Sequence, residues 1–355
     1  MNNLDNLDEI KKLDSANSLE SIKELKEQCL DAWTESTKLN FSSVTPVDLI
    51  TISGMGGSLY SYYFVTSIFA GKLKIPIIPT NSYHLPSFLL KNSLVLASTY
   101  SGTTEETLSC ANEALLRGLK LTGITTGGKL KELLTENNLV SFIFNPAHNP
   151  SNQPRMGQGY MIFGTFGILN GLGAIELSTQ EVEESVKILD QGESLYGASV
   201  KTEDNPAKTL ALKLRDKAPI IVASEFLDGN AHAWRNQFNE SGKQFSDYHI
   251  IPELNHHLME GLSFPEKIKQ SLSFLFVNSN LYEDKIQKRI ELTKEIVNKQ
   301  NIDVIEINPI GQTKLEQSLS LLQFGSYVTF YLAVLNNVDP NKIPWVDFFK
   351  EKLSH

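Results

Sequence analysis

Residues 94–107 read LVLASTYSGTTEET and join three kinds of local structure: a buried strand, a turn and the start of a helix. The apolar run 94–97 is typical of a strand that is buried in a parallel sheet. Residues 98–104 then place six hydroxyl side chains and one glycine in seven positions. One or two hydroxyls are enough to cap the free amides of a first helical turn. The excess predicts a second partner, and a helix N-terminus after a strand is suited to phosphate.

Two interpretations of this turn are open at this point. In the first, the hydroxyls only cap the helix that begins near Glu105. In the second, they also bind phosphate. Glu105 and Glu106 fit both, because carboxylates in a first helical turn complement the positive end of the helix dipole. Other parts of the chain must decide between the two.

The composition is that of an acidic globular protein with a sizeable core. The chain has 355 residues, enough for about two domains, and 41% of them are hydrophobic. The formal net charge of −9 argues against a nucleic-acid-binding protein and against binding to an anionic membrane surface. An anionic substrate would therefore have to be attracted by local positive groups.

The cysteines and the apolar runs indicate a soluble protein of the reducing cytoplasm. Cys29 and Cys110 are far apart, which excludes a disulfide framework and a zinc site of the usual spacing. The first residues, MNNLDNLDEIKKLDS, are charged and lack the apolar core of a signal peptide. No run of about 18 apolar residues is visible, so no membrane span is expected.

Predicted strands alternate with helical patterns along the chain, as in a parallel sheet that helices cover on both faces. Strands are predicted at residues 46–53, 73–80, 93–98, 119–126, 139–144, 218–224, 248–253, 272–279 and 302–308. Helices are predicted at residues 19–39, 159–175, 314–336 and 346–353, among others. The predicted fold class is α/β with two domains of similar size. They comprise residues 1–175 and 211–355, with a connecting helical segment at 176–210.

The first predicted strand ends in SGMGGS, residues 53–58, where glycines let the backbone approach a ligand closely. A dinucleotide cofactor is not expected, because the spacing is not GxGxxG. The next strand also ends in Thr80 and Asn81 instead of a ribose-binding carboxylate. Because the carboxyl ends of parallel strands share one edge of a sheet, this turn and the hydroxyl-rich turn are expected to lie together. Together they predict a phosphate site.

Five motifs occur in the order that is shared by one enzyme family. From the N-terminal side they are GMGGS, TYSGTTEET, NQPRMGQGY, QFNESGK and PELNHH, and they cover about residues 50–260. This ordered set resembles the bifunctional phosphoglucose/phosphomannose isomerases of the sugar isomerase (SIS) superfamily. The later stretch YLAVLNNVDPNKIPWVDFFKEKLS resembles the same family. The resemblance implies two SIS-type three-layer αβα subdomains, each with a mainly parallel sheet flanked by helices.

The resemblance also implies an activity and an assembly. The activity is an aldose–ketose isomerisation without cofactor or metal. It interconverts glucose 6-phosphate, and also mannose 6-phosphate, with fructose 6-phosphate in glycolysis and gluconeogenesis. The assembly is a homodimer with its active site near the subunit interface. The implied partner is a hexose 6-phosphate, and neither a nucleic acid nor a membrane.

The functional residues of the family match positions of this sequence. Its phosphate-binding turns match Gly56, Gly57, Ser58, Thr99, Ser101 and Thr104. The arginine of its QPR motif matches Arg155, and the glutamate of its NEN-type motif matches Glu240. The histidine of its PELNHNE motif matches His256, and a lysine near its C-terminus matches Lys350.

The sequence departs from the family pattern at a few of these positions. Thr99 stands in place of serine and Thr103 in place of asparagine, and both changes keep polarity. After His256, the residues at 257–258 are histidine and leucine instead of asparagine and glutamate. Residues 341–344 contain no threonine, which some relatives use for mannose phosphate. The resemblance therefore supports the phosphoglucose activity more directly than the phosphomannose activity.

The matched residues form a complete set for moving a proton between C1 and C2 of a sugar phosphate through a cis-enediol. A carboxyl group with a modestly raised pKa suits this transfer, so Glu240 is the expected base. His256 is expected to protonate the ring oxygen, because histidine titrates near neutral pH. Arg155 is expected to stabilise the enediolate. The phosphate site would supply positioning energy.

Each of these residues also has an ordinary structural interpretation. Glu240 and Lys350 fit solvated helix residues, His256 a hydrogen-bonded loop residue, and Arg155 a surface ion pair. Two other functions are open as well. One is a non-catalytic SIS module that senses a sugar phosphate, against which Glu240 and Arg155 argue. The other is a different SIS enzyme, such as an amino-sugar isomerase or a lyase, against which the QPR and PELNH motifs argue.

Overall fold

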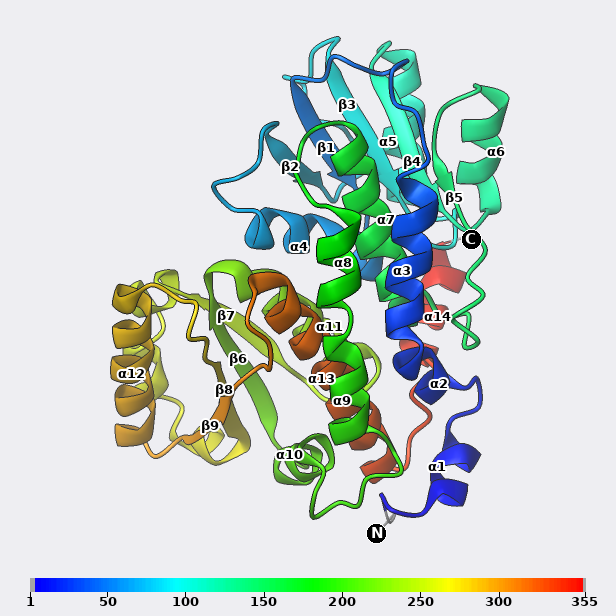
Figure 1. Ribbon diagram of the computed structural model, residues 1–355. Coiled ribbons are helices and arrows are strands. Elements are labelled where there is room, and N and C mark those ends of the chain that lie inside the picture. Colours follow the sequence, from blue (N-terminus) through cyan, green and yellow to red (C-terminus); the bar gives the residue numbers. More distant parts are fainter. Residues whose placement is uncertain (1–3, 354–355) are drawn as a thin grey trace.

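The computed structural model describes residues 4–353, so the predicted domain limits at residues 1 and 355 lie outside the described residues. Two sheets lie at opposite ends of the molecule, with helices around and between them (Figure 1). The strand order is β2-β1-β3-β4-β5 in the first sheet and β7-β6-β8-β9 in the second, and every pairing is parallel. The strands are β1 (Leu49–Ser53), β2 (Ile77–Thr80), β3 (Ser93–Ser98), β4 (Lys120–Thr125), β5 (Phe142–Ile143), β6 (Ala218–Ser224), β7 (Asp247–Ile251), β8 (Leu272–Val277) and β9 (Asp303–Ile307).

Helices cover both faces of the first sheet. They are α3 (Leu25–Ser36), α4 (Tyr60–Ile68), α5 (Glu105–Leu116), α6 (Gly128–Glu136) and α7 (Gln158–Gly171). Alternating side chains of β3 show the two faces: Leu94 and Leu96 pack with residues of α3, α4 and α7, whereas Val95 and Ala97 pack with residues of α5 and α6. β3 is buried along its whole length, as a central parallel strand should be. The first half of the chain is therefore a three-layer αβα unit.

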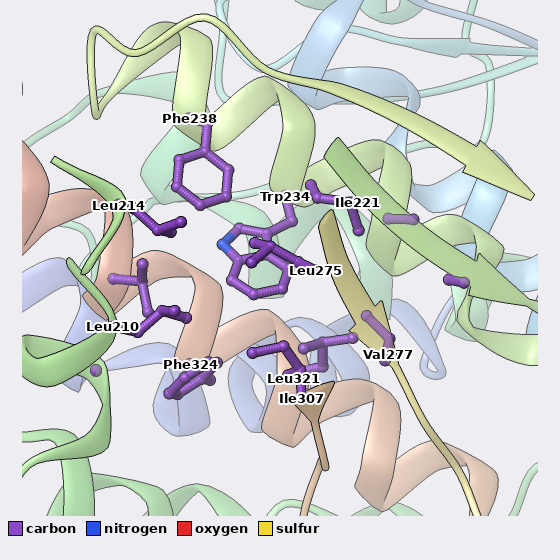
Figure 2. Close-up of a cluster of buried hydrophobic side chains, with 14 of the residues drawn as sticks. Leu210, Leu214, Ile221, Trp234, Phe238, Leu275, Val277, Ile307, Leu321 and Phe324 are labelled. Carbon is purple, nitrogen blue, oxygen red and sulfur yellow. The ribbon is translucent and has the colours of Figure 1, made fainter. Parts of the chain in front are cut away.

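The second sheet packs with α10 (Pro206–Leu214), α11 (Asp228–Glu240), α12 (Asp284–Lys299) and α13 (Lys314–Leu335). Figure 2 shows part of this core, where Trp234 and Phe238 of α11 stack with their ring centroids 5.4 Å apart. Gly325 lets α13 come close, because a Cβ atom there would lie only 2.7 Å from Cδ1 of Trp234. This packing fixes the orientation of α11, whose last residue is Glu240.

The helix α13 joins the two halves of the molecule. Leu315 and Leu319 belong to the apolar core of the first half, whereas Leu321 and Phe324 belong to the core of the second. By length and composition, this helix of 22 residues is long and apolar enough to cross a membrane. Its most apolar stretch is completely buried inside the fold, as in the core helix of a soluble protein. The helix is therefore weak evidence for a membrane span.

The remaining elements are shorter and frame these two units. The helices are α1 (Leu7–Leu13), α2 (Ser18–Lys23), α8 (Thr179–Ser185), α9 (Ile188–Tyr196) and α14 (Pro344–Leu353). The 3₁₀ turns are η1 (Gly56–Leu59), η2 (Pro154–Met156), η3 (Glu225–Leu227), η4 (Glu253–His256), η5 (Glu260–Ser263) and η6 (Glu266–Ser271). In Figure 1, α8 and α9 run down the middle of the view, from the level of the first sheet to that of the second.

The predicted α/β fold with two parallel sheets is confirmed. The predicted strands 93–98 and 218–224 coincide with β3 and β6. The prediction 139–144 was too long, because β5 pairs only with β4 at the edge of the sheet and is limited to two residues. The predicted helix 19–39 consists of two helices, α2 and α3, which are divided at Glu24.

We expect the core of the second sheet to dominate the stability of that half. Leu275 is completely buried in this core, so Leu275→Ala should lower the free energy of unfolding by about 2–5 kcal/mol. Leu116 is 88% exposed, so Leu116→Ala is a matched control that should cost less than about 0.5 kcal/mol. Urea denaturation followed by circular dichroism measures both. Equal effects of the two substitutions would contradict the packing described here.

Candidate active site

The two predicted phosphate turns lie side by side at the carboxyl ends of β1 and β3. These strands are neighbours, and the strand order reverses between them, with β2 on one side and β4 on the other. Such a switch point is the usual ligand site of an open α/β sheet. Two hydrogen bonds join the turns: the amide of Tyr100 donates to Ser58 Oγ (3.0 Å), and Ser98 Oγ donates to the carbonyl of Ser58 (2.6 Å).

The hydroxyl groups of the second turn pair with each other. The Oγ1 atoms of Thr99 and Thr104 are 2.8 Å apart, and Ser101 Oγ is 3.0 Å from Thr103 Oγ1. Thr104 is the N-cap residue of α5, yet its side chain makes no capping hydrogen bond. The first amides of α5 are thus left without a side-chain cap, beside a set of hydroxyl groups. This arrangement favours the phosphate interpretation over capping alone.

The corresponding switch point of the second sheet is unsuited to phosphate. There β6 and β8 end, and the following turns bring Glu225 next to the start of α12. The Glu225 carboxylate accepts a hydrogen bond from the amide of Glu283, the N-cap residue of α12, at 3.1 Å. A carboxylate of the chain therefore occupies the place that an anion would take, and Glu283 and Asp284 add negative charge. This comparison favours the first sheet for the predicted phosphate site.

Arg155 connects the phosphate turns to the C-terminal part of the chain. It is only 5% exposed, and a Cβ atom built on Gly57 would lie 3.6 Å from its Cα. Its Nη2 atom donates to the carbonyl oxygens of Pro340 (2.9 Å) and Asn341 (2.6 Å). Within residues 4–353, its buried Nε atom has no hydrogen-bond partner. Burial lowers the pKa of Arg155, and the negative charge of Glu240 opposes this shift.

Glu240, from the second half of the chain, lies close to Arg155. Burial raises the pKa of its carboxyl group, and the charges of Arg155, Lys243, Lys350 and Arg235 partly offset this rise. A carboxyl group that is poised in this way among cations can both accept and return a proton. The structure therefore brings together two of the predicted catalytic residues, Arg155 and Glu240, from different halves of the chain.

Two buried glutamines tie the elements that carry Arg155 and Glu240. Gln237 of α11 donates to the side-chain oxygen of Gln158 (3.2 Å), and Gln158 donates to the carbonyl oxygen of Arg155 (2.7 Å). The backbone of Arg155 and the last turn of α11 are therefore linked through the protein interior. Within residues 4–353, no group of three or more His, Cys, Asp or Glu side chains is arranged to hold a metal ion.

Two residues that the sequence analysis did not single out also lie beside Arg155 and Glu240. The Nζ atom of Lys243 donates to the carbonyl oxygens of Glu240 (2.5 Å) and Pro340 (3.2 Å). Asn341 holds the C-terminal segment, because its Nδ2 atom donates to Asp14 at 2.8 Å. Lys243 is part of the QFNESGK motif and was therefore recognisable, whereas no pattern in the sequence pointed to Asn341.

The other two predicted catalytic residues are placed differently. Lys350 is exposed on α14, close enough to Glu240 for its charge to lower the pKa of that carboxyl group. His256 is exposed in η4, beyond the carboxyl end of β7. Glu240 lies near the opposite end of this strand, where Asn239 donates to the carbonyl of Ser246 (2.9 Å). The five residues of β7 span roughly 16 Å at about 3.3 Å each, so His256 and Glu240 of one chain are held apart.

Comparisons with known sequences identify relatives over most of the chain. The family model of the bacterial phospho-glucose isomerase C-terminal SIS domain matches residues 203–353. A bifunctional phosphoglucose/phosphomannose isomerase of Caldicellulosiruptor bescii is 34% identical, over 87% of this chain and 90% of the relative. A protein of the same name from Thermoplasma acidophilum is 30% identical, over 86% of this chain and 89% of the relative.

A solved structure with the same fold covers nearly the whole chain. A hypothetical protein from Thermus thermophilus superimposes with a TM-score of 0.75 at 15% sequence identity, and the match covers 98% of this chain and 93% of that one. At this identity the likeness concerns the fold alone. It extends through both sheets and the helices between them.

We predict that the shape of the hydroxyl-rich turn depends on Gly102. This residue has a φ of +70°, and a Cβ atom there would lie 1.7 Å from the carbonyl oxygen of Gly127, so Gly102→Ala forces two backbone segments apart. Gly118 has a similar φ of +63° but open space around it, so Gly118→Ala isolates the conformational cost of about 1–2 kcal/mol. Gly102→Ala should lower the free energy of unfolding, measured by urea denaturation, clearly more than Gly118→Ala does. It should also weaken the binding of a sugar phosphate. Equal costs would contradict the close approach.

Proposed function

This chain belongs to the bifunctional phosphoglucose/phosphomannose isomerase family of SIS-domain proteins, and from this premise we propose that it is an aldose–ketose isomerase. Its substrates are glucose 6-phosphate and mannose 6-phosphate, which it interconverts with fructose 6-phosphate. The observation that carries the proposal is the meeting of Glu240 and Arg155 beside the turn that contains Gly57. We further propose that the protein works in the cytoplasm as a homodimer.

The proposed reaction moves a proton between C1 and C2 of the open-chain sugar. The Glu240 carboxylate takes the proton from the carbon next to the carbonyl group and returns it to the neighbouring carbon. Its burial supports this role, because a raised pKa makes the carboxylate a stronger base and lets the carboxyl group return the proton more readily. The cis-enediol intermediate carries negative charge on its oxygens. Arg155, which is held by two carbonyl groups, is positioned to stabilise that charge.

The substrate phosphate is proposed to bind at the carboxyl ends of β1 and β3. Backbone amides of the turn at 56–58 and of the first turn of α5 would donate to it, together with the hydroxyls of Thr99, Ser101 and Thr104. The cations Arg155 and Lys350 lie nearby, which provides local attraction within a chain of net charge −9. A grip on the phosphate positions the reacting carbons and contributes to catalysis without touching them.

The proposed homodimer accounts for the position of His256. One chain holds its own His256 away from its Glu240, so we propose that the partner subunit's His256 completes the site and acts on the ring oxygen. The surface of α14 supports an interface in this region, since none of its described residues is buried. Trp345, Phe348 and Phe349 on this helix are 82%, 55% and 61% exposed.

The activity is tested by NMR of the purified protein with each sugar phosphate in turn. We expect fructose 6-phosphate to form from glucose 6-phosphate and from mannose 6-phosphate. Formation from glucose 6-phosphate alone would restrict the substrate, in line with the missing threonine at 341–344. Binding of both sugars without conversion of either would contradict the proposal and favour a sugar-phosphate sensor.

In the same assay, Glu240→Gln should lower kcat by about 10²–10⁴-fold, because the variant lacks the group that carries the proton. Binding of fructose 6-phosphate, measured by calorimetry, should persist, because the phosphate turns are intact. Glu136→Gln is a matched control, since Glu136 is an exposed residue at the end of α6 and should not affect turnover. Near-normal turnover of Glu240→Gln would remove Glu240 from its proposed role.

Mixed dimers test whether His256 acts across the interface. Glu240→Gln and His256→Asn should each be nearly inactive alone. After co-refolding of equal amounts of the two variants, half of the dimers contain one subunit of each kind. One of the two sites in each mixed dimer has both native residues. Roughly a quarter of the wild-type activity should therefore return. Co-refolding of Glu240→Gln with the double variant should restore nothing. If the first mixture also stays inactive, His256 does not act in the partner's site.

A further inference from the structure

Lys243 lies three residues after Glu240 and is held in an unusual conformation. Its φ is +52°, in the left-handed region that glycine and asparagine normally occupy at the end of a helix. The backbone alone therefore does not favour a lysine here. The side chain folds back over the helix end and donates to the carbonyl oxygen of Glu240 at 2.5 Å. Its contacts, and not its backbone preference, account for lysine at this position.

The same ammonium group contacts the segment that holds Arg155. The carbonyl oxygen of Pro340 accepts from Lys243 Nζ at 3.2 Å and from Arg155 Nη2 at 2.9 Å. Two like charges thus share one acceptor, an arrangement that is tolerable only with negative charge close by. Asp339 and Glu240 supply this charge, since both act on Lys243 and on Arg155. Lys243 therefore links the end of α11, the segment 339–341 and the guanidinium group.

We propose that Lys243 is a positioning residue for the isomerisation, which clamps the end of α11 to the segment 339–341 and so keeps the Glu240 carboxylate beside Arg155. This inference rests on the proposed function, because it assigns a role toward Glu240 as the base. It adds a residue to those that carry the chemistry, and Lys243 itself does not exchange a proton with the substrate.

The charge of Lys243 gives this role a pH signature. Burial and the neighbouring Arg155 lower the pKa of Lys243 to about 8, with Asp339 and Glu240 opposing. Because this pKa is depressed, Lys243 is charged below about pH 8 and loses its charge above it. While it is charged, it favours the ionised form of Glu240 and lowers the pKa of that carboxyl group.

The other charged or titratable groups around Glu240 do not account for a change of charge near pH 8. Arg155 and Arg235 keep their charge, because guanidinium groups stay protonated in proteins. Burial raises the pKa of the Tyr60 hydroxyl well above its usual range, so Tyr60 stays neutral. Lys350 lies on the exposed α14, where water and salt screen its charge. Loss of the charge on Lys243 is therefore the event expected near pH 8.

A purely structural role is the alternative explanation. Lysine side chains commonly bind the free carbonyl groups at a helix C-terminus and stabilise the helix there. Such a role would change the stability of the protein but would leave the pH dependence of turnover unaltered. The positioning role changes kcat, leaves KM nearly unchanged and shifts the pH profile.

The test compares kcat and kcat/KM for glucose 6-phosphate across the range from about pH 5.5 to pH 9.5, in the wild-type protein and in three variants. Lys243→Met should lower kcat about tenfold or more, leave KM nearly unchanged and move the acid limb of the profile to higher pH. Lys243→Arg should keep most of the activity and lose the inflection near pH 8, because arginine stays charged. Lys285→Met is the matched control. Lys285 is an exposed lysine of α12 and should behave as wild type.

The outcomes separate this inference from the proposed function. A wild-type protein that converts no sugar phosphate contradicts the proposed function itself. An active wild type with an unchanged kcat and pH profile in Lys243→Met overturns only the role of Lys243. If Lys243→Met does not fold by circular dichroism, Lys243→Gly decides, because glycine suits a φ of +52° and removes the side chain. Reduced kcat with a shifted acid limb in this variant supports the role, and a wild-type profile overturns it.

Discussion

The buried charge of Arg155 is the constraint on which the rest of the site depends. A guanidinium group inside a protein has to be hydrogen-bonded, because an unpaired buried charge is very costly. Here the partners are the carbonyl oxygens of Pro340 and Asn341, 185 and 186 residues away in the sequence. This requirement draws the C-terminal segment across to the first sheet. Lys243 binds the same segment through the carbonyl oxygen of Pro340, and α14 begins just after it. The Glu240 carboxylate therefore lies among cations.

The two halves of the molecule share an architecture but differ in charge at the corresponding place. Both sheets have a switch point at the carboxyl ends of two neighbouring strands. In the first, two threonine hydroxyls of the turn pair only with each other, whereas in the second the Glu225 carboxylate accepts a hydrogen bond from the amide of Glu283. The second half contributes instead through α11, which the stack of Trp234 and Phe238 orients (Figure 2). In the proposed mechanism, one half thus binds the phosphate and the other supplies the base.

Much of the fold was predictable from local patterns. The strands β3 and β6 were placed to the residue, because apolar runs between polar turns are a strong signal of buried parallel strands. The predictions were wrong where tertiary contacts determine the limits of an element. Examples are the edge strand β5 and Glu24, where one predicted helix divides into two. The adjacency of the two predicted phosphate turns was also predictable from the sequence. Their composition exceeds what capping needs, and parallel strands bring such turns together.

The sequence by itself determined which chemical groups are available: the hydroxyl-rich turn, the glycine turn, and the ordered motifs that carry Arg155 and Glu240. These features depend on residues that are close in sequence, so they can be read without a structure. Only the tertiary structure decided which groups meet. It placed Lys243 and Asn341 around Arg155, and it held His256 at the far end of β7. The physical reason is that these contacts join segments that are distant in sequence, and packing and the burial of charge select them, whereas local preference does not.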